Sequence, residues 1–198
     1  MIGLLKKKNY MGIQMIEKEI KLLLTKSQYD IIDKSFEWKR TIIQNNHYYG
    51  TLLLENSEYT IRIREIAKKM KLQVKVPIDT NSSLHIKKEY EKEVNDIPKC
   101  LSKEQLKSIT NIDLVDVSYL GKLTTERKVC FFSNDVELCL DSNIYLEHCD
   151  YELEIEYKED YPIDIIKKLS DLGIFIPEKS EGKYTRFIKK LKKEENIV

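Results

Sequence analysis

The stretch that decides the fold is Ile16-Glu17-Lys18-Glu19-Ile20-Lys21-Leu22-Leu23-Leu24. Read as a strand, its period of two puts Glu17, Glu19 and Lys21 on one face, with Ile20 and Leu22 on the other. A single charged face of this kind is usually solvated. The same alternation, with the sign of the charge varied, recurs in almost every later strand-like segment. This recurrence indicates that the charged faces of the strands are directed to one shared place in the fold.

The later segments with this alternation are 58–65, 71–76, 86–94, 136–141 and 151–157. Their polar faces carry like charges two residues apart, as in Arg62/Arg64, Glu89/Glu91 and Glu152/Glu154/Glu156. Like charges on one strand face repel, so each group needs an opposite charge on a neighbouring strand. If acidic and basic strands face one another across a closed barrel, the acidic groups and the basic groups each find their opposite charge. Such an interior would hold a polyanion on its basic side and divalent cations on its acidic side.

Composition narrows the classes of function. Lys and Arg number 34 against 33 Asp and Glu, so the net charge is only +1, whereas non-specific nucleic-acid binding usually requires a basic excess. No apolar run approaches the ~18 residues of a membrane span. The four cysteines have no CxxC spacing, which predicts reduced thiols in a cytoplasmic protein. We expect an N-terminal extension over residues 1–14 and a single domain over 15–198.

Residues typical of helix ends and turns occur between the predicted strands. Thr25 or Ser27 caps a predicted helix that reaches 36–38, and Ser102 caps a helix within 97–109. Pro162 and Gly173 bracket a helix over 163–172, and 183–193 forms a basic terminal segment. Segments 116–124 and 125–133 predict a hairpin with its turn at Gly121 to Lys122 or slightly later. Pro77 is expected to end its strand because it cannot donate to a ladder.

The fold class is therefore α+β and mainly β. Glu17-Lys18-Glu19-Ile20-Lys21 resembles the ExExK signature of the CYTH group, the triphosphate tunnel metalloenzymes, which includes class IV adenylate cyclases, thiamine triphosphatases and inorganic triphosphatases. The resemblance covers residues 16 to about 190, and its specificity comes from the order of the later motifs. These are Arg62-x-Arg64, Lys75 before Pro77, Glu89-x-Glu91, Arg127, Asp141, Glu154-x-Glu156 and Gly182-Lys183-Tyr184-x-Arg186.

The resemblance implies a closed eight-stranded antiparallel barrel, or tunnel, with flanking helices, and a Mg²⁺ or Mn²⁺ cofactor. The implied metal-binding residues are Glu17, Glu19, Glu154 and Glu156, supported by Asp141 and Glu152. The implied triphosphate-binding residues are Lys21, Arg62, Arg64, Lys75, Arg127, Lys183 and Arg186. Glu91, or Glu89 in the alternative register, is expected to orient the basic side chains or a metal. The chain departs from the family at Tyr48-Tyr49-Gly50-Thr51, where the family often has Asp-Thr after the aromatic pair.

The expected activity is metal-dependent hydrolysis of the terminal phosphate of a small triphosphate: inorganic tripolyphosphate, thiamine triphosphate or a nucleoside triphosphate. The alternatives are a class IV adenylate cyclase and a non-catalytic module that binds triphosphate or polyphosphate. Lys21 and Lys183 are candidate bases only if their surroundings lower their pKa. The expected partner is the small substrate, with no specific nucleic acid and no membrane, and the expected state is a monomer or homodimer.

Overall fold

The computed structural model describes the backbone of residues 13–51, 59–79, 84–178 and 180–194, and their side chains except at 13–17, 79 and 84–86. The strands are β1 (Ile13–Leu24), β2 (Arg40–Gly50), β3 (Thr60–Ile66), β4 (Lys69–Asp79), β5 (Leu84–Val94), β6 (Cys100–Leu101), β7 (Val117–Phe131), β8 (Val136–Tyr145) and β9 (His148–Tyr157). The helices are α1 (Lys26–Ser35), α2 (Lys103–Thr110), α3 (Ile163–Asp171) and α4 (Lys183–Glu194).

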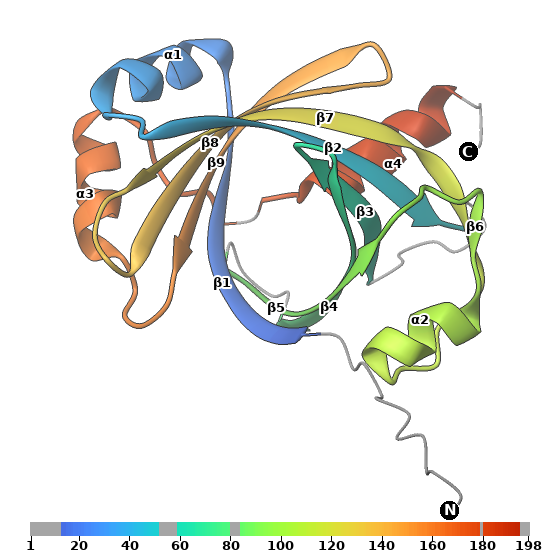
Figure 1. Cartoon of the computed structure of the whole chain (residues 1–198). Coiled ribbons are helices and arrows are strands. Elements are labelled where there is room, and N and C mark those ends of the chain that lie inside the picture. Colours follow the sequence, from blue (N-terminus) through green and yellow to red (C-terminus); the bar gives the residue numbers. More distant parts are fainter. Residues whose placement is uncertain (1–12, 52–58, 80–83, 179, 195–198) are drawn as a thin grey trace, which may run out of the picture.

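The strands form one antiparallel sheet in the order β2-β3-β4-β5-β1-β9-β8-β7-β6, and β2 pairs in addition with β7. Figure 1 shows that the sheet is strongly curled, so that one face turns inward. The mainly β, antiparallel fold with flanking helices is confirmed. That the curled sheet closes into an eight-stranded barrel with a passage for a substrate stays a proposal.

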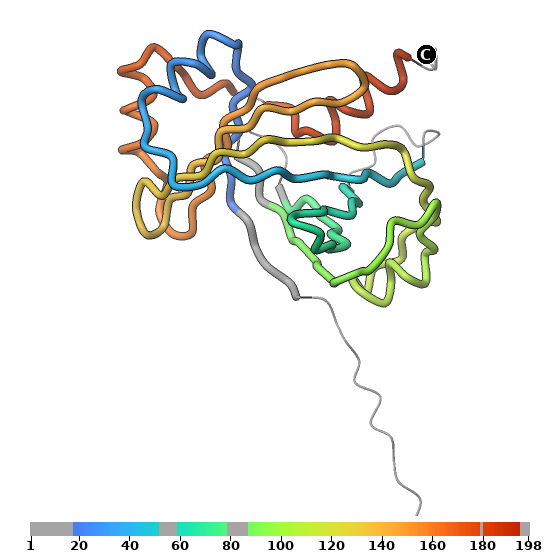
Figure 2. The backbone as a smooth tube through the Cα atoms, turned by 45° about the horizontal axis from the view of Figure 1, so that its top comes forward, coloured from blue at the N-terminus to red at the C-terminus, as the bar shows by residue number. Residues whose placement is uncertain are grey.

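Outside the curl, the apolar halves of the alternating strands form two cores. Ile20, Leu22 and Leu153 belong to a cluster that α1 and α3 cover, and a second cluster joins the outer face of β3 and β4 to α2. In Figures 1 and 2, α1 and α3 lie together at one end of the sheet, while α2 and α4 lie toward the other. The inner face carries the charged residues, which lie beside a third and smaller apolar cluster that includes Tyr48, Leu123 and Phe187.

Local capping explains where two of the helices begin. The Thr25 side chain accepts from the backbone N–H of Gln28, whose own side chain accepts from the Thr25 N–H, which completes a capping box before α1. Ser102 and Gln105 repeat the arrangement before α2. Thr25 and Ser102 are confirmed as caps, whereas Ser27, the other candidate for the first helix, lies inside α1. Helix α2 begins later than the proline-led segment suggested.

Two expectations about strand ends were wrong. The predicted hairpin around Gly121 is instead the single 15-residue strand β7. Gly121 has φ +144 and lies where the β2–β7 register shifts, so the glycine serves a bulge rather than a turn. Pro77 does not end β4, which continues to Asp79; the ladder to β5 becomes irregular just after the proline, where its missing N–H is tolerated.

The chain termini bear on the predicted domain limits. Residues 1–12, most of the predicted extension, lie outside the described residues, and β1 begins at Ile13, two residues before the predicted domain start. Of the helices that the structure describes, none combines the length and apolar character needed to span a bilayer.

Candidate active site

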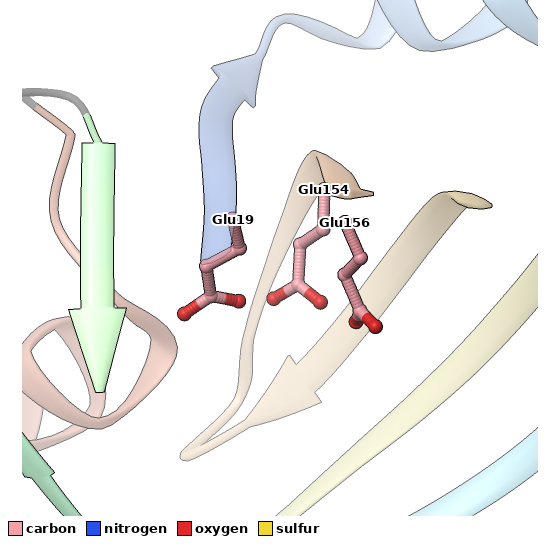
Figure 3. Close-up of side chains that lie close together, drawn as sticks. All are labelled: Glu19, Glu154 and Glu156. Atoms are coloured by element: carbon pink, nitrogen blue, oxygen red, sulfur yellow. The ribbon is translucent and has the colours of Figure 1, made fainter. Parts of the chain in front are cut away.

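Acidic side chains from three neighbouring strands meet on the inner face. In the β1–β9 ladder Glu19 lies opposite Glu156, and in the β8–β9 ladder Asp141 lies opposite Glu152. Carboxylate oxygens of Glu19, Glu154 and Glu156 lie within 4.8 Å of one another (Figure 3). The same holds for Asp141, Glu152 and Glu154, so Glu154 belongs to both trios.

Three cations converge on Glu154. Its Oε1 atom lies 2.6 Å from Lys21 Nζ and 2.8 Å from Lys183 Nζ, while its Oε2 atom accepts from Arg127. Lys21 also donates to Glu19 Oε2 at 2.7 Å. The acidic half of the inner face is thus a network in which each charge touches its opposite, which makes its burial tolerable.

These contacts shift the carboxylate pKa values in different directions. Burial alone would raise them all, but Arg127, Lys183 and Lys21 hold the pKa of Glu154 well below its usual range. The pKa of Glu19 is also lowered, because Lys21 and two further lysines outweigh its burial. Burial dominates at Glu152, whose pKa is raised despite Lys183. Glu19 and Glu154 are therefore ionised at neutral pH.

Helix α4 brings two cations to this network from the far end of the chain. Lys183 and Arg186 lie three residues apart and so share a helix face. Lys183 Nζ lies 2.7 Å from both Asp141 and Glu152, and Arg186 holds Asp150 with two hydrogen bonds of 2.8 and 3.0 Å. The helix is anchored there by Phe187, which packs with other apolar side chains of the inner face.

Basic side chains of β3 and β4 line the opposite part of the inner face. Arg62 and Arg64 come from adjacent inward positions of β3, and Lys75 of β4 lies 3.1 Å from Glu89 of β5. Glu91 accepts from the Gln73 amide at 2.7 Å. The inner face therefore carries its two carboxylate trios on β1, β8 and β9, where cations of β1, β7 and α4 lie among them, and further basic groups on β3 and β4.

A family model for the CYTH domain matches residues 15–182. The chain belongs to the CYTH domain family. A search of curated proteins found no match.

Solved structures share the CYTH fold over most of their length. A proposed adenylate cyclase of Bacillus halodurans is 24% identical, with a TM-score of 0.66 over 89% of this chain and 99% of that one. A proposed adenylyl cyclase of Hippeastrum, with a dominant triphosphatase activity, is 21% identical, with a TM-score of 0.67 over 87% and 95%. A conserved hypothetical protein of Pyrococcus furiosus is 20% identical, with a TM-score of 0.57 over 86% and 99%. At these identities the likeness establishes the fold.

The CYTH domain brings together most of the residues singled out from its sequence. All the predicted basic residues lie on the inner face or reach it from α4, and five of the six predicted metal ligands form the two trios. The sixth, Glu17, has its backbone in β1 opposite Lys87, and its side chain lies outside the described residues. Glu89 and Glu91 were the two alternative positions for the supporting carboxylate. Both face inward, because they lie on the same face of their strand.

Sequence reasoning missed several buried polar residues of the inner face, among them Asp150, Asn46 and Gln73. Asp150 continues the alternation of Glu152 and Glu154, so its position was available from parity alone. Asn46 and Gln73 are buried and bond to the two arginines of β3. Nothing in their residue type marked them, since neutral amides are common in strands that face water.

The acidic trios fit a divalent metal ion. Hard cations such as Mg²⁺ prefer oxygen ligands, and each trio offers three carboxylates from strands that hold them in place. The two lysines proposed as bases fit that role less well. Although burial would lower the pKa of Lys21 and Lys183, the surrounding carboxylates raise both. The geometry favours them as ammonium groups that neutralise charge.

Proposed function

We propose that this CYTH domain is a metal-dependent triphosphatase that releases the terminal phosphate of a small triphosphate inside a closed tunnel formed by its eight long strands. The observation that carries the proposal is that one buried face holds two carboxylate trios together with a set of arginines and lysines. A pure anion-binding site has no need of buried carboxylate trios. A pure metal site has no need of paired arginines beside it.

The residues take complementary roles. Glu19, Glu154 and Glu156, with Asp141 and Glu152, would hold Mg²⁺ or Mn²⁺, and the strand parity of Glu17 allows it to join them. A bound metal ion supplies charge neutralisation and activation of water in phosphoryl transfer. Arg62, Arg64 and Lys75 would hold the phosphates from β3 and β4.

Four further cations complete the phosphate-binding set: Lys21, Arg127, Lys183 and Arg186. In this structure each contacts a carboxylate, and most of those carboxylates belong to the metal trios. Binding of metal and substrate together therefore requires these side chains to exchange carboxylate oxygens for phosphate oxygens. Arginine offers the planar, bidentate geometry that suits a phosphate, and lysine acts as a point charge.

The related structures support the triphosphatase reaction and also suggest the alternative, an adenylate cyclase reaction. The Hippeastrum protein has a dominant triphosphatase activity, while both it and the Bacillus protein are proposed cyclases. A cyclase must activate a ribose hydroxyl instead of water. Both reactions use the same charged face, so the fold does not distinguish them. Analysis of the reaction products does.

The test measures phosphate release from tripolyphosphate, thiamine triphosphate and ATP, each with Mg²⁺, Mn²⁺ or EDTA. Metal-dependent release, with one substrate preferred, is the expected result. Cyclic AMP from ATP without phosphate release would assign the protein to the cyclases. Tight triphosphate binding without any product would leave a binding module.

A further inference from the structure

The two arginines of β3 differ from the other inner-face cations in what holds them. Arg64 Nε donates to Asn46 Oδ1 at 3.0 Å, and Arg62 Nε donates to Gln73 Oε1 at 2.8 Å. Both acceptors are neutral amides. Among the described residues neither arginine forms an ion pair. Arg127 and Arg186, in contrast, each donate two hydrogen bonds to an aspartate. The β3 pair is therefore positioned by amides and makes no direct ion pair, although the Glu89 carboxylate is near enough to interact with both charges.

Electrostatics agree with the contacts. Desolvation, together with the like charges of Arg62 and Arg127, outweighs the carboxylates of Glu89 and Glu154 and lowers the pKa of Arg64 to about 10. A guanidinium group stays charged even so at neutral pH. Removing an uncompensated cation from water costs free energy, and that cost is recovered when an anion binds beside it.

The amide orientations follow from their partners. An arginine N–H can only donate, so the oxygen of Asn46 must face Arg64 and its NH₂ group must point elsewhere. Gln73 is fixed at both ends, because its oxygen accepts from Arg62 while its Nε2 donates to Glu91 at 2.7 Å. Glu91 therefore orients a basic side chain through Gln73.

This arrangement leaves two buried donors facing inward. Asn46 is 1% exposed and Arg62 is 6% exposed. Asn46 Nδ2 and Arg62 Nη2 have no hydrogen-bond partner among the residues that the structure describes. Buried donors are nearly always paired in folded proteins. Two unpaired donors on neighbouring strands, next to arginines that make no direct ion pair, therefore point to a ligand rich in acceptor oxygens.

We propose that Asn46 positions the substrate: its Oδ1 atom holds Arg64, and its Nδ2 atom donates to a phosphate oxygen that Arg62 also contacts. The proposal rests on the proposed function in that it takes the triphosphate as ligand. It adds that this subsite binds phosphate without metal, since none of its four polar residues, Asn46, Arg62, Arg64 and Gln73, belongs to a carboxylate trio.

The test is calorimetric titration of inorganic tripolyphosphate into the protein in EDTA. Asn46→Asp keeps the size of the side chain but places a carboxylate against Arg64 and removes the inward donor. We expect its affinity for tripolyphosphate to fall about 30-fold, the size of one lost charge-assisted hydrogen bond. The melting temperature should stay the same or rise, because the new carboxylate pairs with a partly buried arginine, so loss of the fold would not explain the result.

The control is Asn45→Asp, one residue away on the outward face, where Asn45 bonds to Glu65. It adds the same charge and should change the affinity less than threefold. Wild-type protein that fails to bind tripolyphosphate in EDTA, or Asn46→Asp protein that binds within threefold of wild type, overturns the inference.

The outcomes separate the inference from the proposed function. If tripolyphosphate binds as expected but no substrate is hydrolysed with any metal, the triphosphatase proposal fails and the role of Asn46 stands. If wild type hydrolyses its substrate while Asn46→Asp raises neither its KM nor its dissociation constant, the role of Asn46 fails alone.

Discussion

Glu154 lies at the centre of the acidic network, and Glu154→Gln tests what that network contributes. The substitution keeps the shape of the side chain and removes the charge shared by Lys21, Lys183 and Arg127. Removing one partner of a buried ion pair costs about 3–5 kcal/mol. The glutamine oxygen can still accept one hydrogen bond, so the lower end, about 3 kcal/mol, is expected at pH 7.

The effect should depend on pH in a defined direction. The cations hold the pKa of Glu154 well below its usual range, against the effect of burial. A carboxylate with a lowered folded-state pKa contributes stability above its unfolded pKa, about 4.3, and loses it as pH falls. The difference between wild type and Glu154→Gln should therefore shrink by about 1.4 kcal/mol per unit below pH ~4.3.

Urea denaturation in EDTA measures this difference without bound metal. With an m-value of about 2 kcal/mol/M, a loss of 3 kcal/mol lowers the urea midpoint by about 1.5 M. Glu126→Gln, an exposed position on β7, is the control and should shift the midpoint by less than about 0.3 M. A Glu154→Gln midpoint within that same margin of wild type at pH 7 would refute the account of the network.

Three further outcomes are expected. Glu19→Ala and Arg64→Ala should each abolish phosphate release while circular dichroism shows an intact fold; full activity in either counts heavily against the proposed site. Gly121→Ala should destabilise the protein by about 1–3 kcal/mol, because its Cβ would lie 2.9 Å from the Phe187 ring at a positive φ; an unchanged melting temperature would contradict this. Thr25→Ala should cost about 1 kcal/mol through the lost N-cap of α1 and leave turnover unchanged, so a fall in turnover at equal folded fraction would be unexpected.

Much of the site was predictable because strand parity is a local property. Glu19 and Lys21 face inward while Ile20 and Leu22 face the outer core, as the alternation required. The motif order added which charges belong together. Asp150 follows the same rule and was overlooked only because the prediction stopped at Glu152.

The turns were harder to predict from the sequence than the strands. The β3–β4 hairpin turns at Ala67-Lys68 and the β8–β9 hairpin at Leu146-Glu147, all with positive φ. Tight hairpin turns of this kind normally carry Gly, Asn or Asp, so neither pair gave a signal. Gly121 gave a turn signal and is in fact within a strand, since the same freedom of φ serves turns and bulges.

By itself the sequence determined the two faces of each strand, because a period of two is fixed by the backbone of the strand and needs no knowledge of its neighbours. It also determined the charge content of the inner face. Which charges meet depends on how the strands and helices pack together. Lys21 reaches Glu154 across 133 residues of sequence, and Lys183 arrives on a helix beyond the sheet. Whether a cation is neutralised by a carboxylate or only held by an amide, as Arg64 is by Asn46, depends on strand register, which long-range pairing sets.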